Sequence, residues 1–353
     1  MVEADRIGWV DAARGATIVL IVALHTQGAL ATLGADHPAL DSVNVALATV
    51  RLPTFFLISG LFAAAALEAP ARAFVRRRPA LFGYLYLLWS AILIATVTVL
   101  ALATGKPVGD AAGGALHDAL FADGVLWYFA ALAVFFTVAR LTRRLPVAAQ
   151  FAGALVLAVV AATDVLPIPS WGVDHMLSSY VWFLAGWHGR ARAEAFAARA
   201  TPVRCLALAG GWLAGGALLR LADPSGRALV ALLPLVAVPL AISLAAVVTR
   251  RFDVARLRTL GRHTLPVYVL HPVVIAVLVA GLGALTPRPL ADLPLPVQAL
   301  LVLVGLVAVT AASWGAWRAL HRVTWLFALP APRVPVPAAV GNVRMSERSE
   351  GPA

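Results

Sequence analysis

Apolar residues occur along this chain in runs long enough to cross a lipid bilayer, with short polar stretches between them. A membrane-spanning helix needs roughly 20 mostly apolar residues. The pattern therefore predicts an all-α, polytopic membrane helical bundle of about ten transmembrane helices. The predicted spans are residues 10–33, 43–67, 81–103, 126–141, 147–165, 171–188, 203–221, 229–248, 264–285 and 297–318.

The composition favours the same class of protein. Hydrophobic residues make up 61% of the 353 residues, charged residues make up 13%, and the mean hydropathy is +0.87. A soluble domain averages roughly 45–50% apolar and about 25% charged residues. Cys205 is the one cysteine, which excludes an internal disulfide framework and a site of several thiolates.

The net charge of +11 is distributed very unevenly among the loops. Of the 28 Lys and Arg residues, 22 precede the first span or follow an even-numbered span, and 4 lie in the loops on the opposite side. Cytoplasmic loops carry the excess of Lys and Arg. We therefore expect both termini in the cytoplasm, and we interpret the positive charge as a topology signal and not as a nucleic-acid surface.

The chain is predicted to contain one folded unit and one tail. Residues 1–327 form the membrane-embedded domain. Residues 328–353 are rich in Pro, Ser and charge, a composition typical of disorder. We expect them to form a disordered cytoplasmic tail.

The first span carries two ionisable groups, Arg14 and His25. An α-helix turns ~100° and rises ~1.5 Å per residue, so residues eleven apart share one face about 16 Å apart. Asp11 precedes Arg14 by three residues and is predicted to pair with it. Ionised groups inside a membrane are costly and usually functional. Because Thr26 and Gln27 follow His25, a purely structural role is harder to assign to this histidine.

The second span contains RLPTFFLISG, from Arg51 to Gly60. Arg51 and His25 each lie about eight residues, or ~12 Å, from the outer ends of their helices. If the two helices are neighbours, we expect both side chains to face one cavity. Ser59 and Gly60 permit close approach to another helix.

Further candidates lie on the fourth and ninth spans. Tyr268 and His271 are three residues apart in GRHTLPVYVLH and should share a face. Trp127 and Tyr128 open the fourth span at its outer end.

Structural interpretations compete at each position. Arg14 could be a cytoplasmic anchor, Arg51 could snorkel or form a structural ion pair, and His271 could be a buried group satisfied by a neighbouring helix. The aromatic residues could serve packing alone. The remaining histidines make no ligand spacing with Cys or carboxylates, so no metal site is predicted.

The motifs together resemble those of acyltransferase family 3. WVDAARG with Arg14 and His25 resembles the first-helix signature of this family, RLPTFFLISG looks like its second-helix segment, and GRHTLPVYVLH is similar to its late Y-x-x-H motif. The three occur in the expected order. Leu52 stands where the family commonly has Met.

The resemblance implies an integral membrane O-acyltransferase in a bacterial plasma membrane. Such enzymes transfer an acyl group, commonly acetyl from acetyl-CoA, to hydroxyls of sugars on cell-envelope glycans, glycolipids or antibiotics. No bound cofactor is implied; the partners are acyl-CoA as donor substrate, the sugar acceptor and the lipid bilayer. Catalytic importance is carried over to His25 and Arg14, and substrate binding to Arg51, Asp11, Ser59, Tyr268, His271 and Trp127.

This chemistry requires a base and an anion-stabilising group. A neutral imidazole can remove the hydroxyl proton during attack, and His25 is the candidate base; an acyl-histidine intermediate is the open variant. Arg51 is placed by depth to stabilise the oxyanion, and Arg14 to hold the donor. The alternative from another class is a polytopic transporter that uses intramembrane His and Arg as a proton or anion relay.

Overall fold

The computed structural model describes residues 7–163, 170–222, 231–285 and 290–330, and every regular element in these ranges is helical. Each predicted span coincides with a helix. These are α1 (Gly8–Ala31), α2 (Pro38–Leu61), α5 (Pro79–Thr104), α7 (Trp127–Thr142), α8 (Val147–Thr163), α9 (Trp171–Ala198), α10 (Pro202–Ala222), α12 (Pro234–Arg251), α14 (Thr264–Leu285) and α15 (Leu295–Leu320).

The polytopic membrane bundle is confirmed. Within the described ranges, seven helical segments are long and apolar enough to cross a membrane, while α7 and α8 are apolar but shorter. Helix α9 has 28 residues, and four of them, Asp174, Arg190, Arg192 and Glu194, are charged. Ten crossings therefore stay a prediction. Residues 164–165 and 229–230 of two predicted spans and residues 331–353 of the predicted tail lie outside the described residues.

Several segments expected to be loops are short helices. They are α4 (Ala71–Arg77), α6 (Val108–Phe121), α13 (Ala255–Arg262) and the 3₁₀ turns η2 (Leu290–Asp292) and η3 (Thr324–Leu326); a further short helix, α3 (Ala64–Glu68), lies where the second span was predicted to end. The second span was predicted too far along the chain, because α2 begins at Pro38 and ends at Leu61, where the chain turns before α3. Short helices of this kind are stabilised by tertiary packing more than by propensity.

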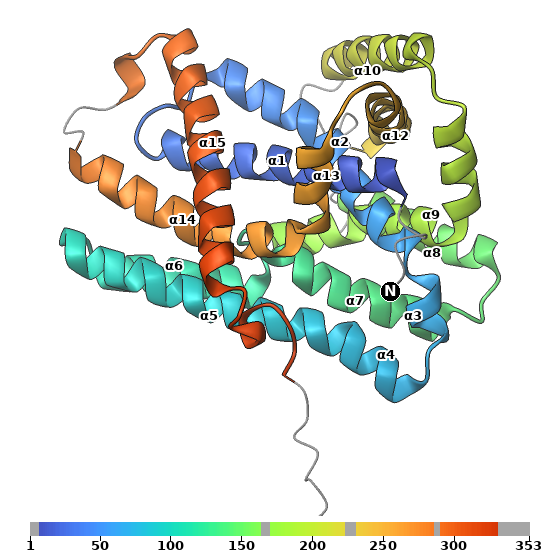
Figure 1. Ribbon diagram of the computed structural model, residues 1–353, viewed down its shortest axis with the longest axis horizontal. Helices are drawn as coiled ribbons and strands as arrows, with labels where there is room; N and C mark the ends of the chain where they lie inside the picture. Colours follow the sequence, from blue (N-terminus) through green and yellow to red (C-terminus); the bar gives the residue numbers. More distant parts are fainter. Residues whose placement is uncertain (1–6, 164–169, 223–230, 286–289, 331–353) are drawn as a thin grey trace, which may run out of the picture.

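Helix α1 lies across the middle of the molecule, with α2, α12, α13, α14 and α15 packed around it (Figure 1). Its contact with α13 is close because two glycines meet there. A Cβ on Gly261 would overlap the backbone carbonyl of Asp11, and one on Gly15 would overlap the carbonyl of Leu257. The crossing fixes the beginning of α1, where Arg14 lies.

An aromatic core joins α2, α7 and α9. The rings of Phe56 and Phe135 have centroids 5.0 Å apart, and Phe135 lies 5.8 Å from Phe183. Phe56 and Phe183 are fully buried. Between membrane helices such rings associate through van der Waals packing, because lipid tails are as apolar as the side chains themselves. This packing holds Ser59 on α2 against Tyr128 on α7.

Helices α5 and α6 form a hairpin along one edge of the molecule (Figure 1). The hydroxyl of Tyr86 on α5 donates a hydrogen bond to the carbonyl of Ala119 on α6 at 2.6 Å. No side chain of α6 is buried. The hairpin supplies one wall of the cavity described next.

Candidate active site

His25 lies on the wall of a cavity of about 560 Å³. Its side chain is half-buried, six residues before the end of α1. Of the polar residues that follow it, Gln27 donates its amide proton to the carboxylate of Asp41 on α2 at 2.7 Å, and Thr26 Oγ1 is buried without a hydrogen-bond partner among the described residues. The imidazole of His25 is thus the polar group that α1 presents to the cavity.

A second imidazole lies next to the first. The rings of His25 and His271 have centroids 5.3 Å apart. His271 is fully buried on α14, and its Nδ1 lies 3.2 Å from the carbonyl of Val267. Since a carbonyl only accepts, Nδ1 must carry the proton, which leaves Nε2 as an acceptor. That Nε2 is buried without a partner among the described residues.

Tyrosines continue the row of aromatic groups beyond His271. Tyr268 lies 5.8 Å from His271, which confirms that the two share a face, and its hydroxyl donates to the carbonyl of Val125 at 2.6 Å. Tyr128 lies 5.7 Å from Tyr268, and its hydroxyl is 2.6 Å from Ser59 Oγ. Ser59 donates its own proton to the carbonyl of Phe55. Tyr128 is therefore the donor to Ser59.

Arg51 is buried, with 3% of its surface exposed, and lies close enough to His25 to interact with it electrostatically. Its Nη1 lies 3.4 Å from Asn44 Oδ1, and its Nε has no partner in the described part of the chain. Arg51 does not line the cavity beside His25, so a shared cavity for the two side chains stays a prediction. That cavity is lined by residues of α1, α5, α6, α7, α9 and the segment before α7, and α2 contributes no lining residue.

The predicted ion pair between Asp11 and Arg14 was also wrong. No nitrogen of Arg14 lies within 4.0 Å of the Asp11 carboxylate among the described contacts, and Asp11 Oδ2 is buried without a partner. The guanidinium of Arg14 lies instead 5.0 Å from the ring centre of Phe62. Cation–π contact with Phe is the competing interaction, and Asp11 still acts on Arg14 through space.

Other arginines gather at this end of α1. Arg190 on α9 lies 5.4 Å from the centre of the same Phe62 ring, and Arg78 lies 5.0 Å from the centre of the Phe136 ring. Arg78 is near enough to Arg14 for mutual repulsion, and its Nε is unpartnered. Glu194 pairs with Arg190 at 2.9 Å. A cluster of cations with few carboxylates is suited to an anionic ligand.

The cavity wall includes residues that sequence reasoning missed. Trp127, which was predicted to bind substrate, does line the cavity. Trp171, Asp118, Asp123 and Tyr86 line it as well but were not singled out. The available signal was the capping sequence SWGVD, in which Ser170 accepts a hydrogen bond from the N–H of Val173 and marks a helix start beside a Trp.

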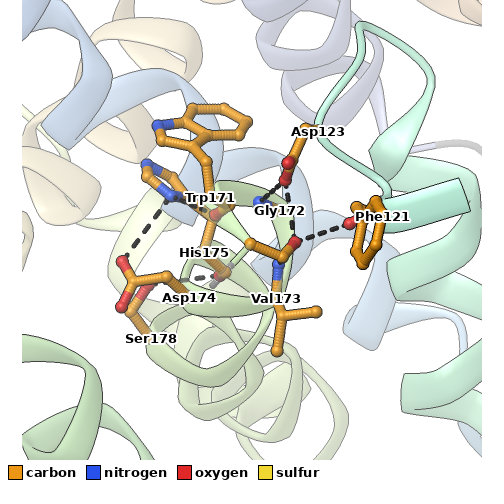
Figure 2. Close-up of polar contacts among 9 residues, drawn as sticks. Phe121, Asp123, Trp171, Gly172, Val173, Asp174, His175 and Ser178 are labelled. Carbon is orange, nitrogen blue, oxygen red and sulfur yellow. Dashed lines mark hydrogen bonds and ion pairs between the residues drawn. The ribbon is translucent and has the colours of Figure 1, made fainter. Parts of the chain in front are cut away.

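Figure 2 shows how the loop after α6 is fastened to the beginning of α9. Asp123 accepts hydrogen bonds from the N–H of Gly172 at 2.9 Å and from Ser170 Oγ at 2.7 Å. The donation from Gly172 is the largest cause that lowers the pKa of Asp123, so this carboxylate is ionised at neutral pH. Trp171 stacks on His175 with ring centres 3.8 Å apart.

The arrangement has the parts needed for proton transfer and charge stabilisation. An imidazole on a cavity wall can remove a proton from a bound hydroxyl, and a buried guanidinium near it can stabilise a developing oxyanion. No group of three or more His, Cys, Asp or Glu side chains in the described residues could hold a metal ion. The described groups are suited to acid–base chemistry.

Comparison with known proteins identifies the family of the chain. The acyltransferase family 3 domain, described as an acyltransferase domain, matches residues 7–318. The chain is also 26% identical over 204 residues to the inner membrane protein YcfT of Escherichia coli (strain K12), which covers 51% of this chain and 56% of that protein. The chain thus spans little more than half the length of this relative. No solved structure is detectably similar. The match over almost the whole chain shows that it belongs to acyltransferase family 3, and its long apolar helices show a multi-pass membrane protein.

Proposed function

We propose that this protein transfers an acetyl group from acetyl-CoA to a hydroxyl of a carbohydrate or glycoconjugate in a bacterial plasma membrane, with His25 as the general base. The observation that carries the proposal is the position of His25 on the wall of the cavity, beside His271. The membrane location is supported by the relative YcfT, which is named an inner membrane protein.

The chemical step follows from the groups around His25. The acceptor oxygen attacks the thioester carbon while the imidazole takes its proton, a new C–O bond forms, and the C–S bond breaks. The thiolate of CoA leaves and takes up a proton. Arg51, buried near His25 without a carboxylate within 4.0 Å among the described ion pairs, stabilises the oxyanion.

The donor binds at the other end of α1. Arg14, Arg78 and Arg190 bring three guanidinium groups to Phe62 and Phe136. Guanidinium groups bind phosphates with two parallel hydrogen bonds. The phosphates of acetyl-CoA bind these residues, and the thioester arm extends along α1 toward His25. The charge distribution over the loops predicts that this end faces the cytoplasm, where acetyl-CoA is made.

The test is the His25→Ala variant, assayed in nanodiscs for transfer of radiolabelled acetyl from acetyl-CoA to an extract of envelope glycans. Loss of a general base costs about 10²–10⁴-fold, so kcat should fall at least ~100-fold with an unchanged thermal midpoint. His321→Ala is the matched control, since His321 is exposed at the end of α15.

Two results distinguish the alternatives. Activity of His25→Ala near the wild-type value removes the base assignment. Label that stays on the wild-type protein in the absence of acceptor, and disappears in His25→Ala, indicates an acyl-histidine intermediate in place of direct transfer.

A further inference from the structure

The cavity beside His25 has chemically different parts. The hairpin of α5 and α6 contributes an apolar stretch, which consists of Leu93, Val97, Ala111, Ala115 and Ala119, and also the polar residues Tyr86, Ser90 and Asp118. The rest of the lining includes the indoles of Trp127 and Trp171 and the imidazole of His25. A ligand that fills the cavity can therefore place an apolar part against the apolar stretch and its reacting part near His25.

Trp171 is an unusual wall residue because it is 51% exposed. It lies edge-on to Trp127, with ring centres 5.7 Å apart at 81°, and stacks on His175. Ser170 and Gly172, the residues on either side of it, are fastened to Asp123 by hydrogen bonds (Figure 2). The indole is thus a fixed, flat, apolar surface at the cavity, suited to the apolar face of a sugar ring.

The charges on the wall are all of one sign. Asp118 and Asp123 line the cavity, and no Lys or Arg does so among its described lining residues. Arg51 interacts with His25 but does not line the cavity. This contrasts with the chain as a whole, whose net charge is +11. An anionic group held near Asp118 would be repelled, and a cationic group would be attracted.

We propose that this cavity selects acceptors by charge: it binds a glycoside with an apolar aglycone that carries no negative charge on the ring, with Trp171 stacking on that ring and Asp118 rejecting anionic sugars. The inference rests on the proposed function and specifies its acceptor. An amino sugar is expected to bind better than a neutral sugar, and a neutral sugar better than a uronic acid.

The test measures binding, which needs no turnover. The probes are 4-nitrophenyl glycosides of glucosamine, glucose and glucuronic acid, titrated by calorimetry against the full chain in nanodiscs of zwitterionic lipid. The glucuronide should bind at least about fivefold more weakly than the glucoside, which corresponds to one charge repulsion across ~4 Å in water. The glucosaminide should bind more tightly than both.

Variants assign the effect to residues. Asp118→Asn should bring the affinities of the glucoside and the glucuronide together, and Asp118→Lys should invert their order. Trp171→Ala should weaken all three by a similar factor, about 2–10-fold. Asp110→Lys is the matched control on α6, because Asp110 is exposed, does not line the cavity and lies eight residues, or ~12 Å, away, beyond the Debye length of about 8 Å.

His25→Ala separates this inference from the proposed function, since the variant should keep the order of affinities while losing transfer. Equal binding of the glucoside and the glucuronide overturns the charge selection. So does an order of affinities that Asp118→Lys leaves unchanged. Failure of all three glycosides to bind overturns the acceptor assignment and leaves acyl transfer to be judged by the His25 assay.

Discussion

His25 and His271 face each other without a carboxylate within 4.0 Å in the described ion pairs. In many enzymes a third group orients the catalytic base. Here the neighbouring group is another imidazole, fixed by the carbonyl of Val267, with Nε2 free to accept a proton. We propose that His271 orients His25 and shares the proton that His25 removes from the acceptor.

A His271→Gln variant tests this role, because glutamine keeps a polar side chain but cannot relay a proton. We expect kcat to fall about 10–100-fold. KM for acetyl-CoA should not change, because His271 lies beside the rings of His25 and Tyr268 and not in the proposed donor site. The measurement is steady-state transfer in nanodiscs. A normal kcat combined with a lower thermal midpoint would show that His271 serves packing alone.

For single residues, helix spacing predicted which side chains share a face of one helix, whereas cavity residues that come from distant segments were missed. The spacing of Tyr268 and His271 requires a shared face, and the structure has it. Trp171 and Asp118 lie in segments expected to be a span end and a loop, and only the fold brings them to His25. The Asp11–Arg14 pair failed because Phe62, 48 residues after Arg14, provides a competing partner.

Among the elements, the crossing of α1 and α13 is the tightest constraint near the proposed donor end. Gly15 and Gly261 allow the two backbones to approach without room for a side chain. Helix α13 has eight residues, three of them Arg, and could not be recognised from hydropathy. Helix α6 was missed because its glycines lower helix propensity, while the hairpin with α5 stabilises it.

Gly261→Ala should destabilise the protein through this crossing. The added methyl group would overlap the carbonyl of Asp11, and overpacking of this kind costs typically 1–3 kcal/mol. The thermal midpoint in nanodiscs should fall by several degrees. Gly281→Ala on α14 is the control, because a Cβ there meets no atom within 4 Å. Equal midpoints for the two variants would contradict the close approach.

For the whole molecule, the all-α bundle was predictable from the apolar runs, since lipid requires backbone groups to be satisfied within each span. Helix ends were less predictable, as α2 and α9 show. The orientation rests on the arrangement of Arg residues between spans. That arrangement, with the Arg-rich α13 packed on the beginning of α1, predicts that this end of α1 lies on the cytoplasmic side.

Cysteine labelling in spheroplasts tests this orientation, because the native Cys205 is buried. Gly113→Cys on α6 and Arg256→Cys on α13 place thiols at exposed positions. A membrane-impermeant maleimide should label the first in intact spheroplasts and the second only after lysis. Labelling of Arg256→Cys before lysis would reverse the topology.

Helix α1 carries both Arg14 and His25, and its rigid backbone separates them by about 16 Å. A donor whose phosphates bind beside Arg14 must have a carrier long enough to deliver its carbonyl carbon to His25. Short thioesters, such as an acetylated simple alkanethiol, would have no anchor and would react only at high concentration. The distance between these two residues of α1 thereby discriminates among donors by the reach of their carrier, whatever acyl group they bear.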